Sequence, residues 1–432
     1  MPSELPPSLV LPPDARPAVA IVRRLADAGH QAVLAGGCVR DLLLGGAPHD
    51  YDVATDSPPQ RVLELFRASR QVGMQFGVVL VKQHRRWVEV ATFRSDVPYL
   101  DGRRPATVTL TDAQHDAFRR DFTVNGMFLD PLAGRIVDYV GGQVDLHARV
   151  IRAIGMPAAR FEEDHLRLLR AVRFAARLGF EIEPTTLAAT QQHAAQLARV
   201  APERVRDELE KMLAHPARAR AWSLLSACGL RPYLWPGAAW TGDQSQRCAT
   251  LLRRLPPEAP AALALAVLLE DRPADEIERV ARALTLSNEQ REMVLWLVAH
   301  QTDCDDPAAP TLPQLKRLMA NPAFAVLCQW AAARHADYAN GAARQAALQA
   351  RLAGIRPEAV APTPLVTGDD LLSRGVPHGP VYKQVLEALY TRQLAEELTT
   401  REQAVLALEE LLRGVAVAGR LRNPAAPKSY RR

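Results

Sequence analysis

The pair Gly36-Gly37 and the pair Asp50 and Asp52 lie close together in residues 32–56, which read AVLAGGCVRDLLLGGAPHDYDVATD. The apolar run at 32–35 predicts a buried strand, and the glycine pair that follows it predicts a tight turn. Residues 38–44 then read as a two-turn helix, and residues 49–54 as a second strand that carries both aspartates. The stretch therefore requires strands and helices to be mixed in the first part of the fold.

Gly36 and Gly37 lie between the first predicted strand and the helix. Backbone N–H groups at such a place bind anions, and glycine lets a phosphate approach closely. The pattern is neither GxGxxG nor GxxxxGK(S/T), which disfavours a Rossmann fold and a P-loop. Arg40, one turn into the helix, would reach the same phosphates, although an isolated arginine there is also consistent with a plain surface residue. We predict a phosphate-binding loop at these three residues.

Three acidic residues are candidates for metal-assisted catalysis. Asp50 and Asp52 are two apart on the predicted strand, so both side chains would point to one face. Adjacent carboxylates repel each other, and Mg²⁺ is bound by one or two carboxylates together with phosphate oxygens of a substrate. Glu89 alternates with Val88 and Val90 and would face the same side, unless it is an ordinary exposed strand residue. We predict Asp50, Asp52 and Glu89 as catalytic, with Asp50 and Asp52 as ligands of Mg²⁺.

The composition limits the class of protein and its partners. A net charge of +5 and a pI of about 9.1 are compatible with a polyanionic partner but do not require one. No apolar run reaches membrane-spanning length, and the proline-rich start lacks the basic-then-apolar order of a signal peptide. The five cysteines are scattered and never spaced CxxC, which favours free buried thiols. We expect a cytoplasmic protein without a membrane segment.

The sequence pattern changes near residue 157. Before it, strand and helix patterns mix, with a predicted helix at 112–129. After it, patterns up to about residue 414 are almost entirely helical, and alanine, leucine, arginine and glutamate dominate. The last fourteen residues, GRLRNPAAPKSYRR, hold five basic side chains and no acid, which fits a solvated end or a contact with RNA phosphates.

Five motifs in order resemble one known family. GGCVRD at 36–41 together with DYD at 50–52 resembles the first motif of the tRNA nucleotidyltransferase and bacterial poly(A) polymerase family, in its bacterial and eukaryotic branch. The remaining motifs are RRDFTVN at 119–125, DP through GG at 130–142, EDHLR at 163–167 and APER through Glu208 and Lys211. Residues 366–389 are similar to the tail segment of CCA-adding enzymes. The resemblance thus spans most of the chain.

The resemblance implies an α+β fold, with a polymerase-β-like nucleotidyltransferase head followed by an all-α neck, body and tail. We therefore expect this division: a disordered N-terminal segment at 1–16, the catalytic head at 17–155, the neck at 156–215, the body at 216–310, a tRNA-binding body and tail at 311–419, and a flexible basic tail at 420–432.

The resemblance also assigns roles around the nucleotide. Arg120, Asp121 and Asn125 match the motif that helps to bind the sugar and phosphates. Asp164 and Arg167, on a helix expected at 161–178, match the residues that hydrogen-bond the Watson–Crick edge of CTP or ATP. An aspartate accepts from the exocyclic amines of C and A, and arginine donates to their ring acceptors. By the same match, contacts to nucleotide or primer are expected from Arg170 and Arg173.

The reaction implied is addition of C, C and A to tRNA 3′ ends from CTP and ATP, with tRNA as partner and no obligatory protein partner. A-only addition and poly(A) synthesis are alternatives, and an inactive RNA-binding relative is a third. Residues 70–79 lack the basic cluster of bacterial poly(A) polymerases, which argues against polyadenylation. The loop at 95–105 is a feature that CC-adding enzymes lack. The intact acids argue against an inactive relative.

Overall fold

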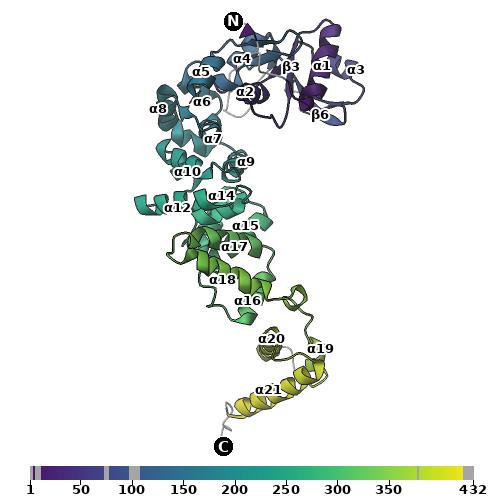
Figure 1. The fold of residues 1–432 in the computed structure, drawn as a ribbon, viewed down its shortest axis with the longest axis vertical. Helices are drawn as coiled ribbons and strands as arrows, with labels where there is room; N and C mark the ends of the chain where they lie inside the picture. Colours follow the sequence, from purple (N-terminus) through teal and green to yellow (C-terminus); the bar gives the residue numbers. More distant parts are fainter. Residues whose placement is uncertain (1–2, 5–10, 73–76, 97–107, 377–378, 422–432) are drawn as a thin grey trace, which may run out of the picture. The chain divides into compact units, whose positions relative to one another are not determined.

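A computed structural model describes residues 3–4, 11–72, 77–96, 108–376 and 379–421 (Figure 1). The chain forms two compact units, the first made of residues 1–268 and 272–291 and the second of residues 269–271 and 292–432. In the described residues no helix is both long and apolar enough to cross a membrane. All five cysteines are free, and four of them are buried, as expected.

The first unit starts with an eight-stranded sheet of order β1-β10-β9-β2-β3-β6-β5-β4. Only β3 and β6 run parallel; the other neighbouring strands are antiparallel. The strands are β1 Ser3–Glu4, β2 Ala32–Ala35, β3 Asp52–Thr55, β4 Ser69–Gln71, β5 Val78–Gln83, β6 Arg86–Thr92, β9 Phe128–Asp130 and β10 Arg135–Val137.

Helices cover both faces of this sheet (Figure 1). On one face α1 (Arg16–Asp27) packs on β2, β3, β5 and β6 and buries Ile21, Val22 and Leu25, while α3 (Pro59–Leu65) packs on β5. On the other face α4 (Ala113–Phe118) packs its alanines in a cluster with side chains of β2, β3 and β9. The second face is where the acidic side chains lie.

β5 and β6 form a hairpin with a two-residue turn. Its two turn residues, His84 and Arg85, have φ of 47° and 67°, as in the turns whose twist suits two-residue hairpins. Further along, β7 (Arg94–Asp96) pairs with β8 (Val108–Leu110). The expected loop at 95–105 falls mostly between these strands, and its residues 97–105 lie outside the described residues, as do residues 73–76 of the segment at 70–79.

Two predictions about the first unit are wrong. The helix expected at 112–129 ends at Phe118, because Phe128–Asp130 pairs with β2 and β10 as β9, and a 3₁₀ turn, η3 (Thr123–Asn125), lies between them. The N-terminal segment is not wholly disordered, because β1 pairs with β10 and a 3₁₀ turn at Pro13–Ala15 leads into α1. The sheet thus uses strand pairing that local propensity does not reveal.

Helices make up nearly all of the rest of the first unit. A two-stranded parallel pair, β11 (Val150–Ile151) with β12 (Glu181–Ile182), is the exception. The helices are α2 Gly37–Leu43, α5 Gly142–Ala148, α6 Pro157–Glu163, α7 Arg167–Leu178, α8 Pro184–His193, α9 Pro202–Leu213, α10 Arg218–Ala227, α11 Arg231–Leu234, α12 Gly242–Arg254, α13 Ala261–Leu268 and α14 Ala274–Ala283.

The second unit is helical throughout the residues described. Its helices are α15 Asn288–Ala299, which begins in the first unit, then α16 Leu312–Met319, α17 Phe324–His335, α18 Gly341–Ala353, α19 Gly368–Leu372, α20 Pro380–Leu394 and α21 Arg401–Leu421. A buried cluster joins α19, α20 and α21 around Leu371, Leu389 and Leu408. The buried Lys316 ammonium of α16 donates to Leu394 O and the Glu396 carboxylate at 2.9 and 2.8 Å.

The units differ from the expected domain limits. No break falls near residue 155, because side chains of α7 bond to the head and to α9; the break falls within α15 instead. The head, neck, body and tail limits remain predictions. Of the expected basic tail at 420–432, only residues 420 and 421 are described, as the end of α21.

Candidate active site

A cavity of about 460 Å³ lies where the sheet, α2 and α7 meet in the first unit. Ten of the thirteen residues predicted for the site line it; Asp50, Glu89 and Arg173 do not. Eight arginines and three aspartates contribute to the lining, so the cavity is strongly basic. The lining residues are Gly36, Gly37, Arg40, Asp52, Arg94, Arg119, Arg120, Asp121, Asn125, Asp164, Leu166, Arg167, Arg170, Phe174, Arg177 and Arg204.

The glycine loop forms one end of the cavity. Gly36 has φ of 75° and ψ of −128°, a conformation that residues with a Cβ rarely adopt. A Cβ at this position would lie 2.8 Å from Nη1 of Arg120. The Gly36 N–H donates to Met127 O at 3.1 Å, which fixes the loop to the segment before β9. The close approach of Arg120 therefore depends on glycine at position 36.

Asp52 and Glu89 are neighbours across the two parallel strands of the sheet. Val53 pairs with Val90, so the preceding residues Asp52 and Glu89 lie level with each other. Both valines are buried on the α1 face, so both acids point to the opposite face. The register confirms the predicted proximity of these two acids.

The environment of Asp52 raises the pKa of its carboxyl group to about 6. Loss of hydration is the largest cause, repulsion by Glu89 the next, and Asp50 adds a smaller repulsion, while Arg120 opposes all three. A carboxylate held this way is stabilised by a cation. The donor set of Asp52 and Glu89 therefore fits a divalent metal that completes its shell with water or substrate oxygens.

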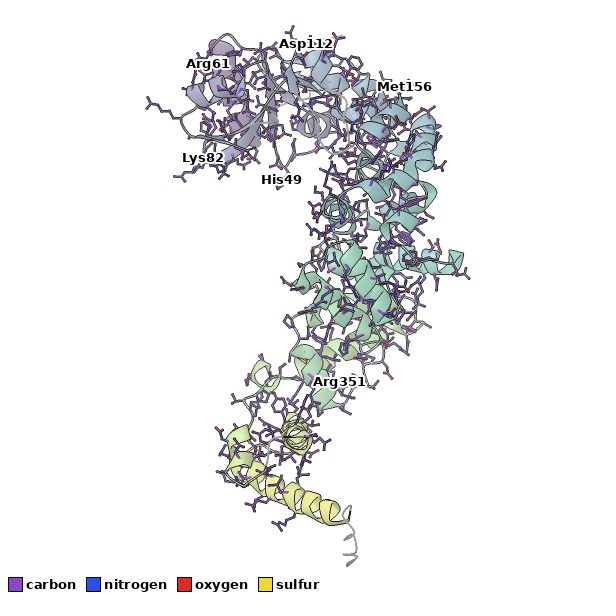
Figure 2. The ribbon with its side chains drawn as sticks, turned by 180° about the vertical axis from the view of Figure 1, so that it is seen from behind. His49, Arg61, Lys82, Asp112, Met156 and Arg351 are labelled. Carbon is purple, nitrogen blue, oxygen red and sulfur yellow. The ribbon has the colours of Figure 1, made fainter. Side chains whose placement is uncertain are left out.

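The position of Asp50 differs from the one predicted. β3 begins at Asp52, so Asp50 precedes the strand and the argument that both aspartates share a strand face is wrong. The pairing of β2 with β3 ends at Ala35 and Asp52, because Gly36 turns the chain away into α2. The Asp50 side chain is 82% exposed and contacts Nδ1 of His49 at 2.9 Å, on the edge of the head where His49 projects (Figure 2). Among the residues described, no three His, Cys, Asp or Glu side chains are gathered closely enough to hold a metal.

A continuous set of hydrogen bonds joins the glycine-loop helix to α7. Nη1 of Arg40 donates to Oδ1 of Asn125 at 2.5 Å, and Nδ2 of Asn125 donates to Oδ1 of Asp121 at 3.1 Å. Oδ2 of Asp121 then accepts from Nη2 of Arg170 at 2.6 Å. Arg40 is almost fully buried, and its remaining donors bind Asp41. Arg40 thus supports the loop from behind as well as lining the cavity.

The pKa of Asp121 falls to about 2. Burial alone would raise it, but the positive charge of Arg170 and the hydrogen bonds from Asn125, Arg170 and the Phe122 N–H outweigh burial. Asp121 is therefore ionised at neutral pH and is committed to the bonds that hold Asn125 and Arg170 in place.

A buried aspartate on α4 positions two further arginines. Oδ1 of Asp116 accepts from Nε of Arg119 at 2.7 Å, and Oδ2 accepts from Nη2 of Arg120 at 3.0 Å. Burial would raise the pKa of Asp116, but these two arginines outweigh it and lower the pKa. The arrangement keeps both guanidinium groups at the cavity wall.

Asp164 separates two helices that were predicted as one. Its φ of −148° and ψ of 101° end α6 at Glu163, so the predicted helix at 161–178 is wrong. Oδ1 of Asp164 accepts from the Leu166 N–H at 3.1 Å, a local bond that competes with helix continuation. Oδ2 accepts from Nη2 of Arg204 on α9 at 2.9 Å. The break turns the carboxylate into the cavity.

Arg167 starts α7 and is held by several acceptors. Nη1 donates to the Arg160 carbonyl at 3.0 Å and to the Glu163 carboxylate at 2.8 Å, and Nη2 donates to Arg119 O at 3.1 Å. Its side chain is 8% exposed. The Asp164–Arg167 pair therefore meets the cavity as a fixed element.

Arg173 lies outside the cavity. Its Nε donates to Glu208 at 2.5 Å, and its guanidinium stacks on Phe174 at 4.2 Å from the ring centroid. Phe174 and Arg177 face the cavity instead. The cavity face of α7 thus follows positions 167, 170, 174 and 177, the 3.6-residue period of a helix, which a constant spacing of three misses.

The sequence analysis did not assign six lining residues to the site. Helical periodicity would have found Phe174 and Arg177, and the fifth motif already contained Arg204. The second motif already contained Arg119, and the fourth already contained Leu166. No pattern in the sequence distinguishes Arg94 from surface residues. The six are Arg94, Arg119, Leu166, Phe174, Arg177 and Arg204.

Comparison with known proteins decides the family. Residues 32–152 match the poly A polymerase head domain, and residues 179–241 match the family described as a probable RNA and SrmB-binding site of polymerase A. The CCA-adding enzyme of Geobacillus stearothermophilus is 34% identical over 397 residues, which cover 91% of this chain and 96% of that enzyme. The chain belongs to the CCA-adding enzyme family.

Two further relatives agree with this family. The CCA-adding enzyme of Geobacillus thermodenitrificans is 39% identical over 304 residues, covering 70% of this chain and 74% of that enzyme. A crystal structure of the Bacillus stearothermophilus CCA-adding enzyme in complex with CTP has a TM-score of 0.79 at 30% identity, and covers 94% of this chain and all of the other. The α+β fold with a polymerase-type head, expected from the motifs of the family, is thereby confirmed.

Proposed function

We infer that this protein is a tRNA nucleotidyltransferase that adds C, C and A to tRNA 3′ ends, with CTP and ATP as substrates. The observation that carries this inference is one cavity that combines the glycine loop, Asp52 and the Asp164–Arg167 pair. Family membership supports it over nearly the full length of the chain. We expect the reaction to take place in the cytoplasm, where tRNA is matured.

The basic end of the cavity would take the triphosphate. Gly36 and Gly37 lie there beside Arg120, and the arginines outnumber the aspartates among the lining residues. A nucleoside triphosphate carries several negative charges, which such a cavity attracts and orients. We propose that Asn125 and Asp121 act mainly by holding Arg40 and Arg170 in place, because their polar atoms already bond to these arginines.

The Asp164–Arg167 end would take the base. A carboxylate accepts from the exocyclic amine that C and A share, and a guanidinium donates to a ring nitrogen or carbonyl. U and G present the opposite pattern and would leave buried groups unpaired. Since Asp164 keeps acceptor capacity beside its bond to Arg204, a base amine is able to share that carboxylate. Selection would then rest on protein side chains without a nucleic-acid template.

Asp50, Asp52 and Glu89 would hold Mg²⁺. The raised pKa of Asp52 and its register with Glu89 support this assignment, and Asp50 is close enough to contribute repulsion. When bound, Mg²⁺ would lower the pKa of the attacking hydroxyl and would stabilise the negative charge that develops at the phosphate. The role of Asp50 requires its exposed side chain to leave His49 and turn toward Asp52.

The chemistry is a displacement at phosphorus. The 3′-hydroxyl of the RNA gives up its proton to water, and its oxygen forms a bond to the α-phosphorus of CTP or ATP. The bond from that phosphorus to the bridging oxygen of the β-phosphate breaks, and pyrophosphate leaves. The protein contributes position and charge: the carboxylates face the reacting atoms, and the arginines balance the phosphate charge.

The test is an extension assay with three labelled tRNAs, which end before C74, after the second C, or with the complete CCA. Each is incubated with CTP, with ATP or with both, in MgCl₂, beside the Asp52→Asn variant as control. CCA addition predicts three added nucleotides on the first tRNA, one on the second and none on the third. Addition restricted to A would identify an A-adding enzyme, and long A tracts a poly(A) polymerase. No extension of any tRNA would contradict the proposal.

A further inference from the structure

Trp87 is a large aromatic side chain left open on the sheet close to the catalytic acids. It is 43% exposed. The guanidinium carbon of Arg70 lies 4.1 Å from the centroid of its ring, and the ammonium of Lys82 lies 5.8 Å from it. We call these three side chains the tryptophan platform. None of the three side chains lines the nucleotide cavity, so binding of the nucleotide does not explain this arrangement.

The strand register places the platform on the same face as the acids. Lys82 pairs with Trp87, so both side chains point to one side of the sheet, opposite the buried Val81 and Val88. Trp87 and Glu89 are two residues apart on β6, so their side chains share a face about 7 Å apart. The face is thus continuous from Glu89 to the platform.

Arg70 belongs to the same face through the edge strand. Arg70 pairs with Leu80, and Leu80 pairs with Glu89, so the three residues form one row across β4, β5 and β6. Asp52 continues that row on β3, because it lies level with Glu89. In Figure 2 the labelled Lys82 side chain projects from the head into open space, as its exposure requires.

The platform and the nucleotide cavity lie on opposite sides of the acids. The cavity is lined by the loop after β2 and by Asp52, and includes no residue of β4, β5 or β6. In the sheet the order is β2, β3, β6, β5, β4, so Asp52 and Glu89 stand between the glycine loop and the platform. A displacement at phosphorus brings the attacking group from the side opposite the leaving pyrophosphate.

We propose that Trp87, Arg70 and Lys82 bind the single-stranded 3′ end of the RNA that supplies the attacking hydroxyl. The indole stacks on a base near that end, and the two cations pair with its phosphates. This proposal rests on the proposed function, since it requires an RNA primer. Base stacking on an exposed aromatic side chain tolerates every base, which suits a primer whose last residue changes after each addition. The partner is RNA because the platform is positively charged.

The test measures the KM for a tRNA ending in CC and, separately, the KM for ATP, in wild type and in Trp87→Ala. The proposal expects the KM for the tRNA to rise about 10-fold or more with an unchanged KM for ATP. Trp87→Phe keeps an aromatic face and should restore most of the affinity. Thermal unfolding of each variant shows whether the fold is retained, so that a loss of structure is not taken for a loss of binding.

Charge is tested by the double variant Arg70→Gln with Lys82→Gln. The plot of log KM for tRNA against log salt concentration should become shallower by about 1.4, which is two phosphate contacts on a single strand. Arg61→Gln is the matched control, because Arg61 is an exposed arginine on α3, which packs against the other face of β5. Its salt slope should equal that of wild type.

Two outcomes overturn the inference. One is an unchanged KM for tRNA in Trp87→Ala, which would mean that the contacts of Trp87 with Arg70 and Lys82 only stabilise the neighbouring strands. The other is an equal rise in the KM for tRNA and the KM for ATP, which would indicate damage to the whole site. If wild type extends no tRNA at all, the proposed function fails first, and that result is distinct from both.

Discussion

Arg170 donates Nε and Nη2 to one carboxylate oxygen of Asp121, at 2.8 and 2.6 Å. The two residues lie on different parts of the first unit: Asp121 follows α4 in the head, and Arg170 lies on α7. The bond therefore fixes the helix that carries Arg167 relative to the loop that carries Gly36. We infer that the distance between the base end and the phosphate end of the cavity depends on this pair.

Asp121→Asn should reduce the free energy of unfolding by about 2–4 kcal/mol at pH 7, because the buried carboxylate loses the charge that pairs with the partly exposed Arg170. The folded-state pKa of Asp121 is about 2, below its ordinary value, so the ion pair stabilises the fold fully above pH 4. That stabilisation is lost as the pH falls toward 2. In urea unfolding, the difference in free energy of unfolding between wild type and variant should stay constant from pH 7 to about pH 4. It should become smaller between pH 4 and pH 3.

The matched control for Asp121 is Asp275→Asn. Asp275 also pairs with an arginine, at 2.6 Å from Arg279, but both side chains are more than half exposed. Its substitution should change the free energy of unfolding by less than about 1 kcal/mol. A difference between wild type and Asp121→Asn that widens in acid would contradict the assigned pKa direction.

Gly36→Ala should lower both stability and activity. The alanine would have to adopt a positive φ of 75°, and its Cβ would lie 2.8 Å from Nη1 of Arg120. Gly29→Ala separates the two effects, because Gly29 has φ of 86° with no atom within 4 Å of a Cβ. Both variants should lose about 1–2 kcal/mol from backbone strain, measured by thermal unfolding. Only Gly36→Ala should also raise the KM for CTP and ATP, and equal kinetics for the two variants would refute the role of the close contact.

Some features of the site could be predicted from local spacing. Alternation along one strand predicted that Glu89 faces away from its valine neighbours, and the structure brings Asp52 level with it on that face. The family resemblance predicted Gly36, Asp121 and Arg167 around one ligand, and all three line the cavity, while their roles stay predictions. These predictions succeed because each depends on a short repeat period or on a family pattern.

Other features depend on contacts that a single stretch does not reveal. The strand start at Asp52 is set by the end of β2, and Asp50 therefore lies outside the strand. The break at Asp164 depends on a side-chain bond to the Leu166 N–H and on Arg204, forty residues away. Arg173 has the spacing of a site residue, but the partner that it finds is Glu208. Tertiary partners decide each of these cases.

Arg167→Ala should reduce the preference for CTP and ATP over UTP and GTP about 10-fold to 100-fold, because one half of the proposed base contact is lost. Its effect on tRNA affinity should be smaller. Arg173→Ala is the control on the same helix, since Arg173 lies outside the cavity and pairs with Glu208. It should leave nucleotide preference unchanged and lower the thermal stability. Competition assays with the four triphosphates measure the preference, and an unchanged preference in Arg167→Ala would refute the assignment.

Asp52→Ala and Asp50→Ala should each reduce nucleotide incorporation by about 10³-fold or more while tRNA binding persists, because both remove a ligand of the proposed metal without touching the basic surface. His49→Ala removes the residue that contacts Asp50 at 2.9 Å and should leave incorporation within a few-fold of wild type. Single-turnover incorporation and filter binding of tRNA separate the two effects. Because Asp50 lies before β3 and is 82% exposed, its variant is the sharper test. Normal turnover in Asp50→Ala would restrict the metal site to Asp52 and Glu89. Loss of tRNA binding with normal residual turnover in Asp52→Ala would contradict the metal role of these acids.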